Sequence, residues 1–141
     1  METSWLRELR RGKKPGSGKL VEHLQRVHQE NPGFTEEYSA NCVDAGGMNT
    51  YQWLAEVIEK EDHKEILDLA CGSGPLLSHC HDKFGGDLSL TGVDMSQAEL
   101  NLAEKRLPDS ATLVQAKAQN LEFIGDEEID VVLCHWALTL M

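Results

Sequence analysis

The sequence predicts an α/β fold in which an open, mostly parallel sheet is flanked by helices. From residue 65 onward, short and almost uninterrupted apolar runs alternate with stretches of helical periodicity. Strands that helices bury on both faces have this pattern. The first apolar run leads directly into the glycine turn Gly72-Ser73-Gly74. A strand, a glycine turn and a helix in succession are typical of parallel sheets that bind nucleotide-like ligands at their strand ends.

The N-terminal segment differs from the rest of the chain in charge. Residues 1–19 hold six basic and two acidic residues, a net charge of +4, so that the chain's −11 leaves −15 for the remainder. Because glycines and a proline interrupt this segment, we expect a solvated and poorly ordered tail. A body so acidic repels phosphate backbones, and we therefore expect no nucleic-acid partner.

Two helices are predicted before the first strand. Their apolar faces consist of Leu20, Leu24 and Val27, and then of Tyr51, Leu54 and Ile58. The first helix ends before Asn31-Pro32-Gly33, and the second breaks at Asp62-His63. We expect residues 20–48 to form a helical cap segment, followed by the main domain at 49–141.

The remaining elements follow in order along the chain. We predict strands at residues 65–69, 88–93, 112–115 and 129–134, with helices at 75–83 and from 96 to 106. Pro75 suits the first turn of a helix, where its missing N–H has no intrahelical partner. Ser96 and Glu99 predict a capping box, in which each side chain bonds the other residue's backbone N–H.

Two carboxylates and one leucine narrow the class of ligand that the sequence predicts. Asp68 lies inside the first strand, where a buried charge is costly unless a partner such as a cationic amine is present. Asp94 ends the second apolar run, and a carboxylate there can accept hydrogen bonds from two ribose hydroxyls. Leu77 stands where a pyrophosphate-binding loop has its third glycine. These residues favour a ligand with a nucleoside, a positive amine and no pyrophosphate.

Four segments resemble known motifs. EILDLACGSGPLL is similar to the first motif of class I S-adenosylmethionine-dependent methyltransferases and LSLTGVDMSQAEL to the second, while ATLVQAKAQNLEF and EEIDVVLCHWALTLM resemble the third and fourth. The resemblance, over residues 49–141, implies a Rossmann-like, three-layer αβα fold. It also implies S-adenosylmethionine as cofactor, S-adenosylhomocysteine as product and a small-molecule methyl acceptor.

The resemblance also assigns roles around the glycine turn. It implies that the backbone of Ala70, Gly72 and Gly74 approaches the methionine part of the cofactor, with Cys71 shaping the turn. Asp68 would hold the cofactor's amino group. A purely conformational role for the glycines, which tolerate positive φ, is equally compatible with this pattern.

The resemblance implies that the nucleoside end of the cofactor binds at the second and third motifs. Asp94 would bind the ribose and Met95 would lie against adenine, although Asp94 could simply precede a helix and Met95 could be ordinary core. Lys117 stands where the family often has an acid, and a lysine cannot accept a hydrogen bond. Adenine recognition would then rest on Ala118 and Gln119, unless this loop only connects two elements.

Three further residues are candidates by resemblance. Cys134 falls where the family makes backbone contacts to methionine, and His135, with a pKa suited to proton transfer, is a candidate general base or else a structural histidine. Tyr38 resembles an aromatic position that touches the cofactor carboxylate in some relatives.

The sequence gives no sign of a metal site, a disulfide framework or a membrane span. The four cysteines form no C-x-x-C pair, and consecutive helical residues such as His79, Cys80 and His81 cannot converge on one ion. No apolar run approaches the roughly 18 residues of a membrane span, and the N-terminus lacks the apolar centre of a secretory signal. We expect a cytoplasmic protein.

Two alternatives to a complete, active methyltransferase stay open. Members of the family usually have seven strands, so we expect a truncated, mainly cofactor-binding portion, or a partner copy that covers the exposed sheet edge as a homo-oligomer. Lys117 and the missing strands also favour a non-catalytic binding module. A nicotinamide-dependent oxidoreductase shares the layout of strand, glycines and acid, but Leu77 and Asp68 oppose it.

Overall fold

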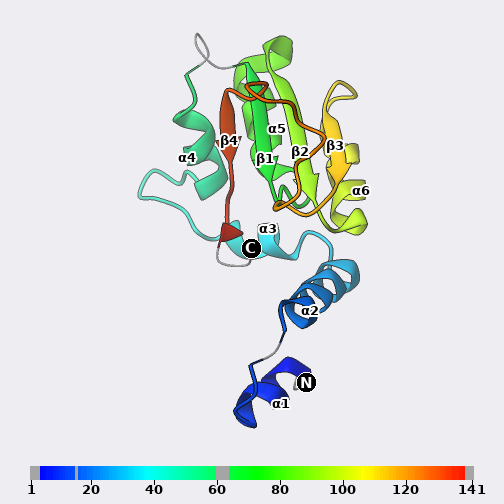
Figure 1. Ribbon diagram of the computed structural model, residues 1–141. Helices are drawn as coiled ribbons and strands as arrows, with labels where there is room; N and C mark the ends of the chain where they lie inside the picture. Colours follow the sequence, from blue (N-terminus) through cyan, green and yellow to red (C-terminus); the bar gives the residue numbers. More distant parts are fainter. Residues whose placement is uncertain (1–3, 15, 60–63, 139–141) are drawn as a thin grey trace.

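A four-stranded, fully parallel sheet forms the centre of the molecule. The computed structural model describes residues 4–14, 16–59 and 64–138. The sheet has the order β3-β2-β1-β4 (Figure 1), and its strands are β1 (Glu65–Leu69), β2 (Ser89–Asp94), β3 (Thr112–Gln115) and β4 (Val131–Leu133). The predicted open parallel sheet is therefore confirmed. The second strand lies one residue later than predicted, and the fourth is shorter, because only three of its residues pair with β1.

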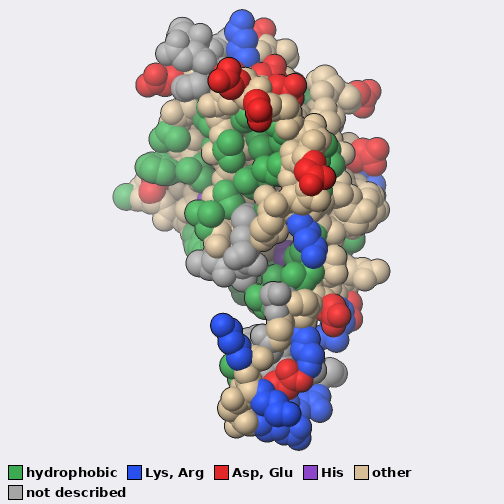
Figure 2. Space-filling view, in the orientation of Figure 1, with side chains coloured by type: hydrophobic (Ala, Val, Ile, Leu, Met, Phe, Trp, Pro, Cys, Tyr) green, Lys and Arg blue, Asp and Glu red, His purple; other side chains and the backbone are tan. Residues whose placement is uncertain are grey.

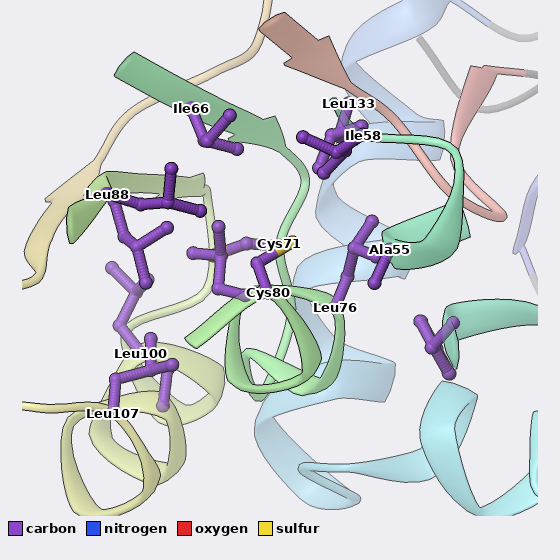
Figure 3. Close-up of a cluster of buried hydrophobic side chains, with 14 residues drawn as sticks. Ala55, Ile58, Ile66, Cys71, Leu76, Cys80, Leu88, Leu100, Leu107 and Leu133 are labelled. Atoms are coloured by element: carbon purple, nitrogen blue, oxygen red, sulfur yellow. The ribbon is translucent and has the colours of Figure 1, made fainter. Parts of the chain in front are cut away.

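Helices pack against this sheet and cover its core. They are α4 (Thr50–Glu56), α5 (Pro75–Phe84) and α6 (Gln97–Arg106), with a short 3-10 helix η1 (Gly85–Asp87) after α5. The core cluster joins β1 to α5 through Ile66, Leu76 and Cys80, all at most 1% exposed (Figure 3). The connection from β3 to β4, residues 116–130, contains neither helix nor strand.

A glycine in β2 permits the close packing of this core. An ideal Cβ on Gly92 would lie 2.9 Å from Cys71 Sγ and from Leu113 Cδ2, and 3.0 Å from Leu77 Cδ1. Real Cβ atoms avoid such distances, so only glycine fits here without a shift of its neighbours. The close approach of α5 to the sheet is thus provided by Gly92, and Leu77 can be fully buried.

The N-terminal region is more helical than the sequence predicted. It contains α1 (Ser4–Arg10), α2 (Ser17–Glu30) and α3 (Phe34–Ser39). Within the expected irregular tail, α1 is a helix that lies away from the sheet (Figure 1), and Lys19 pairs with Glu8 across the turn that follows it. The predicted helix break at Asp62-His63 lies outside the described residues.

Candidate functional site

A cavity lies where the carboxyl ends of the strands meet the cap segment. Its walls come from every strand end and from α2 and α3, as expected for an open parallel sheet. The strand order places the contributions side by side: residues 116–119 after β3, 93–95 at β2, 68 and 70–73 at β1, and 135–137 after β4. Figure 2 shows a recess beside a histidine side chain, between the body of the molecule and the N-terminal helices. Lys and Arg side chains gather at the lower end of these helices.

The glycine turn is held by backbone geometry. Ala70, Gly72 and Gly74 have φ values of 56°, 54° and 77°, and the Cys71 N–H donates to the Val93 carbonyl at 3.0 Å. Ala70, Cys71 and Gly72 line the cavity, whereas Gly74 does not. A Cβ on Gly74 would lie 3.1 Å from Leu107 Cδ1, so this glycine serves the packing of α5 against α6.

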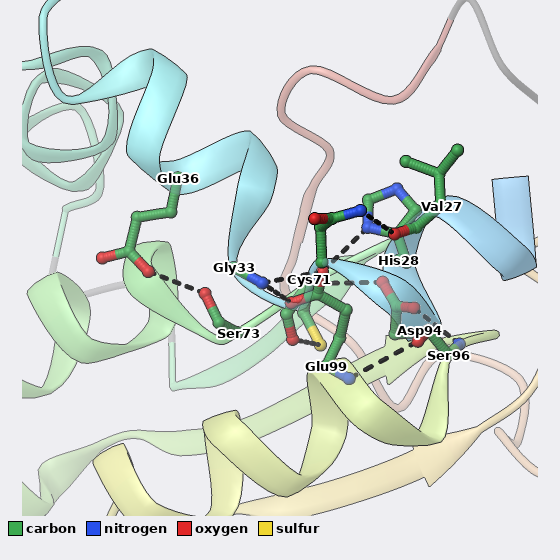
Figure 4. A network of polar contacts seen from close by, with 11 residues as sticks. Val27, His28, Gly33, Glu36, Cys71, Ser73, Asp94, Ser96 and Glu99 are labelled. Carbon is green, nitrogen blue, oxygen red and sulfur yellow. Dashed lines mark hydrogen bonds and ion pairs between the residues drawn. The ribbon is translucent and has the colours of Figure 1, made fainter. Parts of the chain in front are cut away.

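Asp94 connects the turn to the start of α6 (Figure 4). Its Oδ2 accepts the Gly72 N–H at 3.0 Å, and its Oδ1 accepts the Ser96 N–H at 2.8 Å. Burial raises the pKa of Asp94, and these two hydrogen bonds oppose that rise. Each carboxylate oxygen has two lone pairs, so both oxygens retain one for a ligand.

Asp68 faces the same cavity without a partner. Its side chain is 2% exposed, and no hydrogen bond or ion pair joins it to another described residue. Burial, and secondarily the nearby charge of Asp94, raise the pKa of Asp68 well above its usual range. A cationic group in the cavity would offset both effects.

Glu99 anchors the cap segment, and this role differs from its predicted one. Ser96 Oγ accepts the Glu99 N–H at 3.4 Å, but the Glu99 carboxylate does not complete the capping box. It accepts the Gly33 N–H at 3.0 and 3.1 Å and lies 2.8 Å from His28 Nδ1. This hydrogen bond raises the pKa of His28 against the opposing effect of burial. The box prediction was wrong because Glu99 is 2% exposed and points across the cavity edge.

A second carboxylate ties α3 to the glycine turn. Ser73 Oγ donates to Glu36 Oε2 at 2.7 Å, and Arg106 of α6 lies 2.9 Å from the same oxygen. Both Glu36 and His28 line the cavity. The sequence reasoning missed them, although His28 follows Leu24 by four residues and therefore shares the predicted apolar face of its helix.

The segment after β3 lies where an adenine would be expected. Lys117, Ala118 and Gln119 all line the cavity, as does Met95 from the neighbouring strand. Gln115 Nε2 donates to the Met95 carbonyl at 3.3 Å, which links the two strand ends. Lys117 and Gln119 are exposed, while Ala118 and Met95 are half-buried.

The segment after β4 closes the opposite end of the cavity. His135 lines it, packed against Tyr51 with ring centroids 4.4 Å apart and against Trp136 at 5.5 Å. Burial lowers the pKa of His135. Cys134, a predicted contact, is half-buried and does not line the cavity.

Tyr38 lies away from the cavity. Its side chain is 69% exposed and packs on Phe34, with ring centroids 4.7 Å apart. The reason is the register of α3, which turns Ser39 into the interior and Glu36 toward the cavity. Glu36 and Thr35 are therefore the α3 residues that line the cavity, and Tyr38 is not among them.

Residues 66–141 match a family described as a methyltransferase domain. The chain belongs to this family. It is 33% identical over 119 residues to the demethylmenaquinone methyltransferase of Thermotoga maritima, a match that covers 82% of this chain and 49% of that protein. It is 31% identical over 96 residues to a dTDP-3-amino-3,6-dideoxy-alpha-D-glucopyranose N,N-dimethyltransferase of Streptomyces fradiae, covering 67% of this chain and 32% of that protein.

Solved structures show the same fold. One is a SAM-dependent methyltransferase from Thiobacillus denitrificans in complex with S-adenosyl-L-homocysteine, with a TM-score of 0.53 and 23% identity over 72% of this chain and 40% of that one. The chain spans about half the length of the first curated relative that it matches and about a third of the second.

The described part of this family member contains neither a metal-binding cluster nor a membrane-spanning helix. Within residues 4–14, 16–59 and 64–138, no three His, Cys, Asp or Glu side chains form a group that could hold a metal ion. Over the same described ranges, no helix is long and apolar enough to cross a membrane. All four cysteines are free thiols.

Proposed function

We propose that this domain binds S-adenosylmethionine and transfers its methyl group to a small molecule. The observation that carries the proposal is the pair of cavity carboxylates. Asp68 is buried and has no partner among the residues that the structure describes, and Asp94 keeps acceptor capacity beside its two backbone contacts. A ligand with a cationic amine and a ribose satisfies both groups at once.

The remaining contacts of the cofactor follow the strand order. Asp68 and the backbone of residues 70–72 would hold the methionine part, Asp94 the ribose, and Met95 with residues 117–119 the adenine. The exposed Lys117 offers no acceptor, so the adenine amino group would depend on backbone carbonyls and Gln119. This set fits an adenosyl sulfonium without a pyrophosphate.

The chain's own contribution is to position reactants and exclude water. The bound cofactor supplies an electrophilic methyl group on a positively charged sulfur. The cap segment covers the cavity, and the end at His135 and Trp136 would hold the acceptor in line with that methyl group. Alignment and exclusion of water can provide much of the acceleration for such a displacement.

The acceptor class is proposed from the relatives as well as from the site. The two curated relatives described above are named for methylating demethylmenaquinone and a dTDP-linked amino sugar. Both names support a small-molecule acceptor. The cavity's mixture of apolar walls and a few polar groups is typical of such sites.

Calorimetry with S-adenosylhomocysteine tests the cofactor proposal directly. We expect binding by the 141-residue chain and at least a roughly tenfold weaker affinity for Asp94→Ala, because the loss of two ribose hydrogen bonds costs about 1.4 kcal/mol or more. Asp109→Ala, in an exposed turn, serves as the matched control and should leave the affinity unchanged. No heat of binding at millimolar ligand would contradict the proposal.

Binding and methylation assays on the same samples distinguish two other functions from the proposed one. A nicotinamide enzyme would bind NAD in preference to the adenosyl ligand, a result that the buried Leu77 opposes. Lys117 at the adenine end favours a binding module without turnover, and full cofactor occupancy with no methylation of any acceptor would support that alternative.

Assembly and location are proposed on narrower grounds. Val132 on the edge strand β4 is 58% exposed, which supports a homo-oligomer that covers this edge. Sedimentation of the chain as a monomer at all concentrations would contradict it. Four free thiols support a reducing, cytoplasmic location.

A further inference from the structure

Basic side chains gather around α1, at the end of the molecule that lies away from the sheet (Figure 1, Figure 2). The five basic residues from position 7 to position 14 are all exposed, and they are Arg7, Arg10, Arg11, Lys13 and Lys14. Within the part of the chain that the structure describes, no residue forms an ion pair with Arg11, Lys13 or Lys14. Helix α1 and the turn after it therefore present a concentrated positive charge.

The acidic residue of α1 is turned away from the exposed face of the helix. Glu8 pairs with Lys19 of α2, which fixes the side of α1 that faces α2. Successive helical residues point about 100° apart, so Leu9 lies about 100° and Arg10 about 160° around the helix from Glu8. Leu9 is 47% exposed. The face of α1 directed away from α2 thus combines an apolar side chain with positive charge.

The rest of the molecule carries the opposite charge. Residues 20–141 have a net charge of −15, and Figure 2 shows many Asp and Glu side chains at the end of the molecule opposite the basic helix. Exposed charges farther apart than about 8 Å are largely screened at physiological ionic strength. The basic end can therefore approach an anionic surface while the acidic body points away from it.

The exposed leucine helps to choose among anionic surfaces. The backbone of a nucleic acid offers phosphates but no apolar layer, whereas a bilayer with anionic lipids offers charged headgroups above hydrocarbon. An amphipathic helix with basic residues beside an apolar face is typical of segments that lie in this interface. Lysine and arginine also suit it, because their apolar stems can be buried while their charges stay among the headgroups.

We propose that α1 and residues 11–14 dock the protein on a bilayer that contains anionic lipids, with Leu9 toward the hydrocarbon and the basic side chains among the headgroups. The contact is peripheral and depends on charge. Because α2 follows α1 and contributes Val21, Leu24 and His28 to the cavity wall, docking would hold the cavity near the bilayer. The inference does not depend on the methyl transfer proposed above.

Co-sedimentation of the 141-residue chain with vesicles tests this docking. Vesicles of equal parts phosphatidylcholine and phosphatidylglycerol should bind the chain at least about tenfold more strongly than vesicles of phosphatidylcholine alone. Salt at about 1 M, where the screening length falls to about 3 Å, should release the chain. Equal binding to the two kinds of vesicle, or binding that high salt leaves unchanged, would overturn the proposal.

A matched pair of variants locates the contact. Lys13→Gln and Lys105→Gln change the net charge equally, and both lysines are exposed. Lys13→Gln should weaken vesicle binding about fivefold, and the triple variant with Arg11→Gln and Lys14→Gln about a hundredfold, because each basic residue near an anionic surface contributes about a factor of five. Lys105→Gln, on α6, should leave binding unchanged. Equal losses for the two single variants would contradict docking through α1.

A change at Leu9 separates a bilayer from other acidic partners. Leu9→Gln should weaken vesicle binding about fivefold, since it removes an apolar side chain from the interface, and an unchanged urea midpoint would show that the domain still folds. Full vesicle affinity of this variant would overturn the proposal. Binding of the wild-type chain to a short DNA duplex but not to anionic vesicles would also overturn it, as would salt-sensitive dimers without vesicle binding.

These measurements are independent of the cofactor site. They are made without S-adenosylhomocysteine, so a chain that fails to bind this ligand in calorimetry refutes the proposed function and leaves the vesicle result intact. Conversely, a chain that binds the ligand but no anionic vesicle refutes the docking alone.

Discussion

The cavity has two sides, a floor formed by the strand ends and a cover formed by the cap segment, and the contacts that hold them differ. The floor, residues 68–74 and 94–96, follows directly from paired strands, and its contacts include the backbone bond from Cys71 to Val93. The cap segment, residues 20–48, is joined to the floor and to α6 through two carboxylates, Glu99 and Glu36. Regions with few buried contacts open at lower free energy than the core. We therefore expect the floor to unfold with the sheet and the cap segment to open separately.

The largest effect should come from a change beneath the floor. Gly92→Ala places a methyl group 2.9 Å from Cys71 Sγ and from Leu113 Cδ2, and overpacking of this kind costs about 2 kcal/mol. Urea unfolding should show a lower midpoint for the whole domain. Gly86→Ala, whose Cβ would meet nothing within 4 Å, is the matched control. An unchanged midpoint for Gly92→Ala would show that the sheet yields more easily than this packing implies.

A change in the cap segment should act locally. Glu99→Gln leaves one accepting oxygen in place of two and removes the charge beside His28, which costs about 1–2 kcal/mol of local stability. Hydrogen exchange at the Gly33 amide should accelerate, while the urea midpoint of the sheet changes less. Glu104→Gln, exposed on the same helix, should have neither effect. Equal losses at Gly33 and in the sheet would contradict the separation of the two walls.

The cap segment should also loosen as the pH rises. The pKa of folded His28 is raised, first by its hydrogen bond with Glu99 and further by the charges of Glu99 and Asp94. The stabilisation is therefore complete below the unfolded pKa of about 6.5. It is lost as the pH rises through the higher folded pKa. Protection factors at Gly33 should fall over that range, and His28→Gln should flatten the curve. Protection that increases with pH would refute this assignment.

The smallest effect concerns thiol reactivity. Burial raises the pKa of Cys80 to about 12, whereas Cys42 is exposed in the cap segment. Because the thiolate is the reactive form, Ellman's reagent should modify Cys42 first and Cys80 only as the sheet unfolds. Rapid modification of Cys80 under native conditions would mean that the helices over the sheet open as readily as the cap segment.

The same contrast explains what the sequence could predict. The floor is encoded locally, so the strand, the glycine turn and Asp94 were readable from adjacent residues. The cap segment depends on pairs far apart in the chain: His28 and Glu99 are separated by 71 residues, and Ser73 and Glu36 by 37. No periodicity specifies such pairs. Ser96 and Glu99 matched a local capping signal, but burial of the Glu99 carboxylate was better satisfied by Gly33 and His28.

The side-by-side order of the strand ends has an evolutionary consequence. Each strand delivers its own chemical group to the cavity, and the proposed acceptor contacts of His135 and Trp136 come from the segment after the edge strand β4. Under the proposed function, replacement of that segment would change the methyl acceptor while Asp68 and Asp94 stay in place. A lineage with this arrangement could therefore diversify its substrates by altering one short loop, with little selective pressure on the residues proposed to bind the methyl donor.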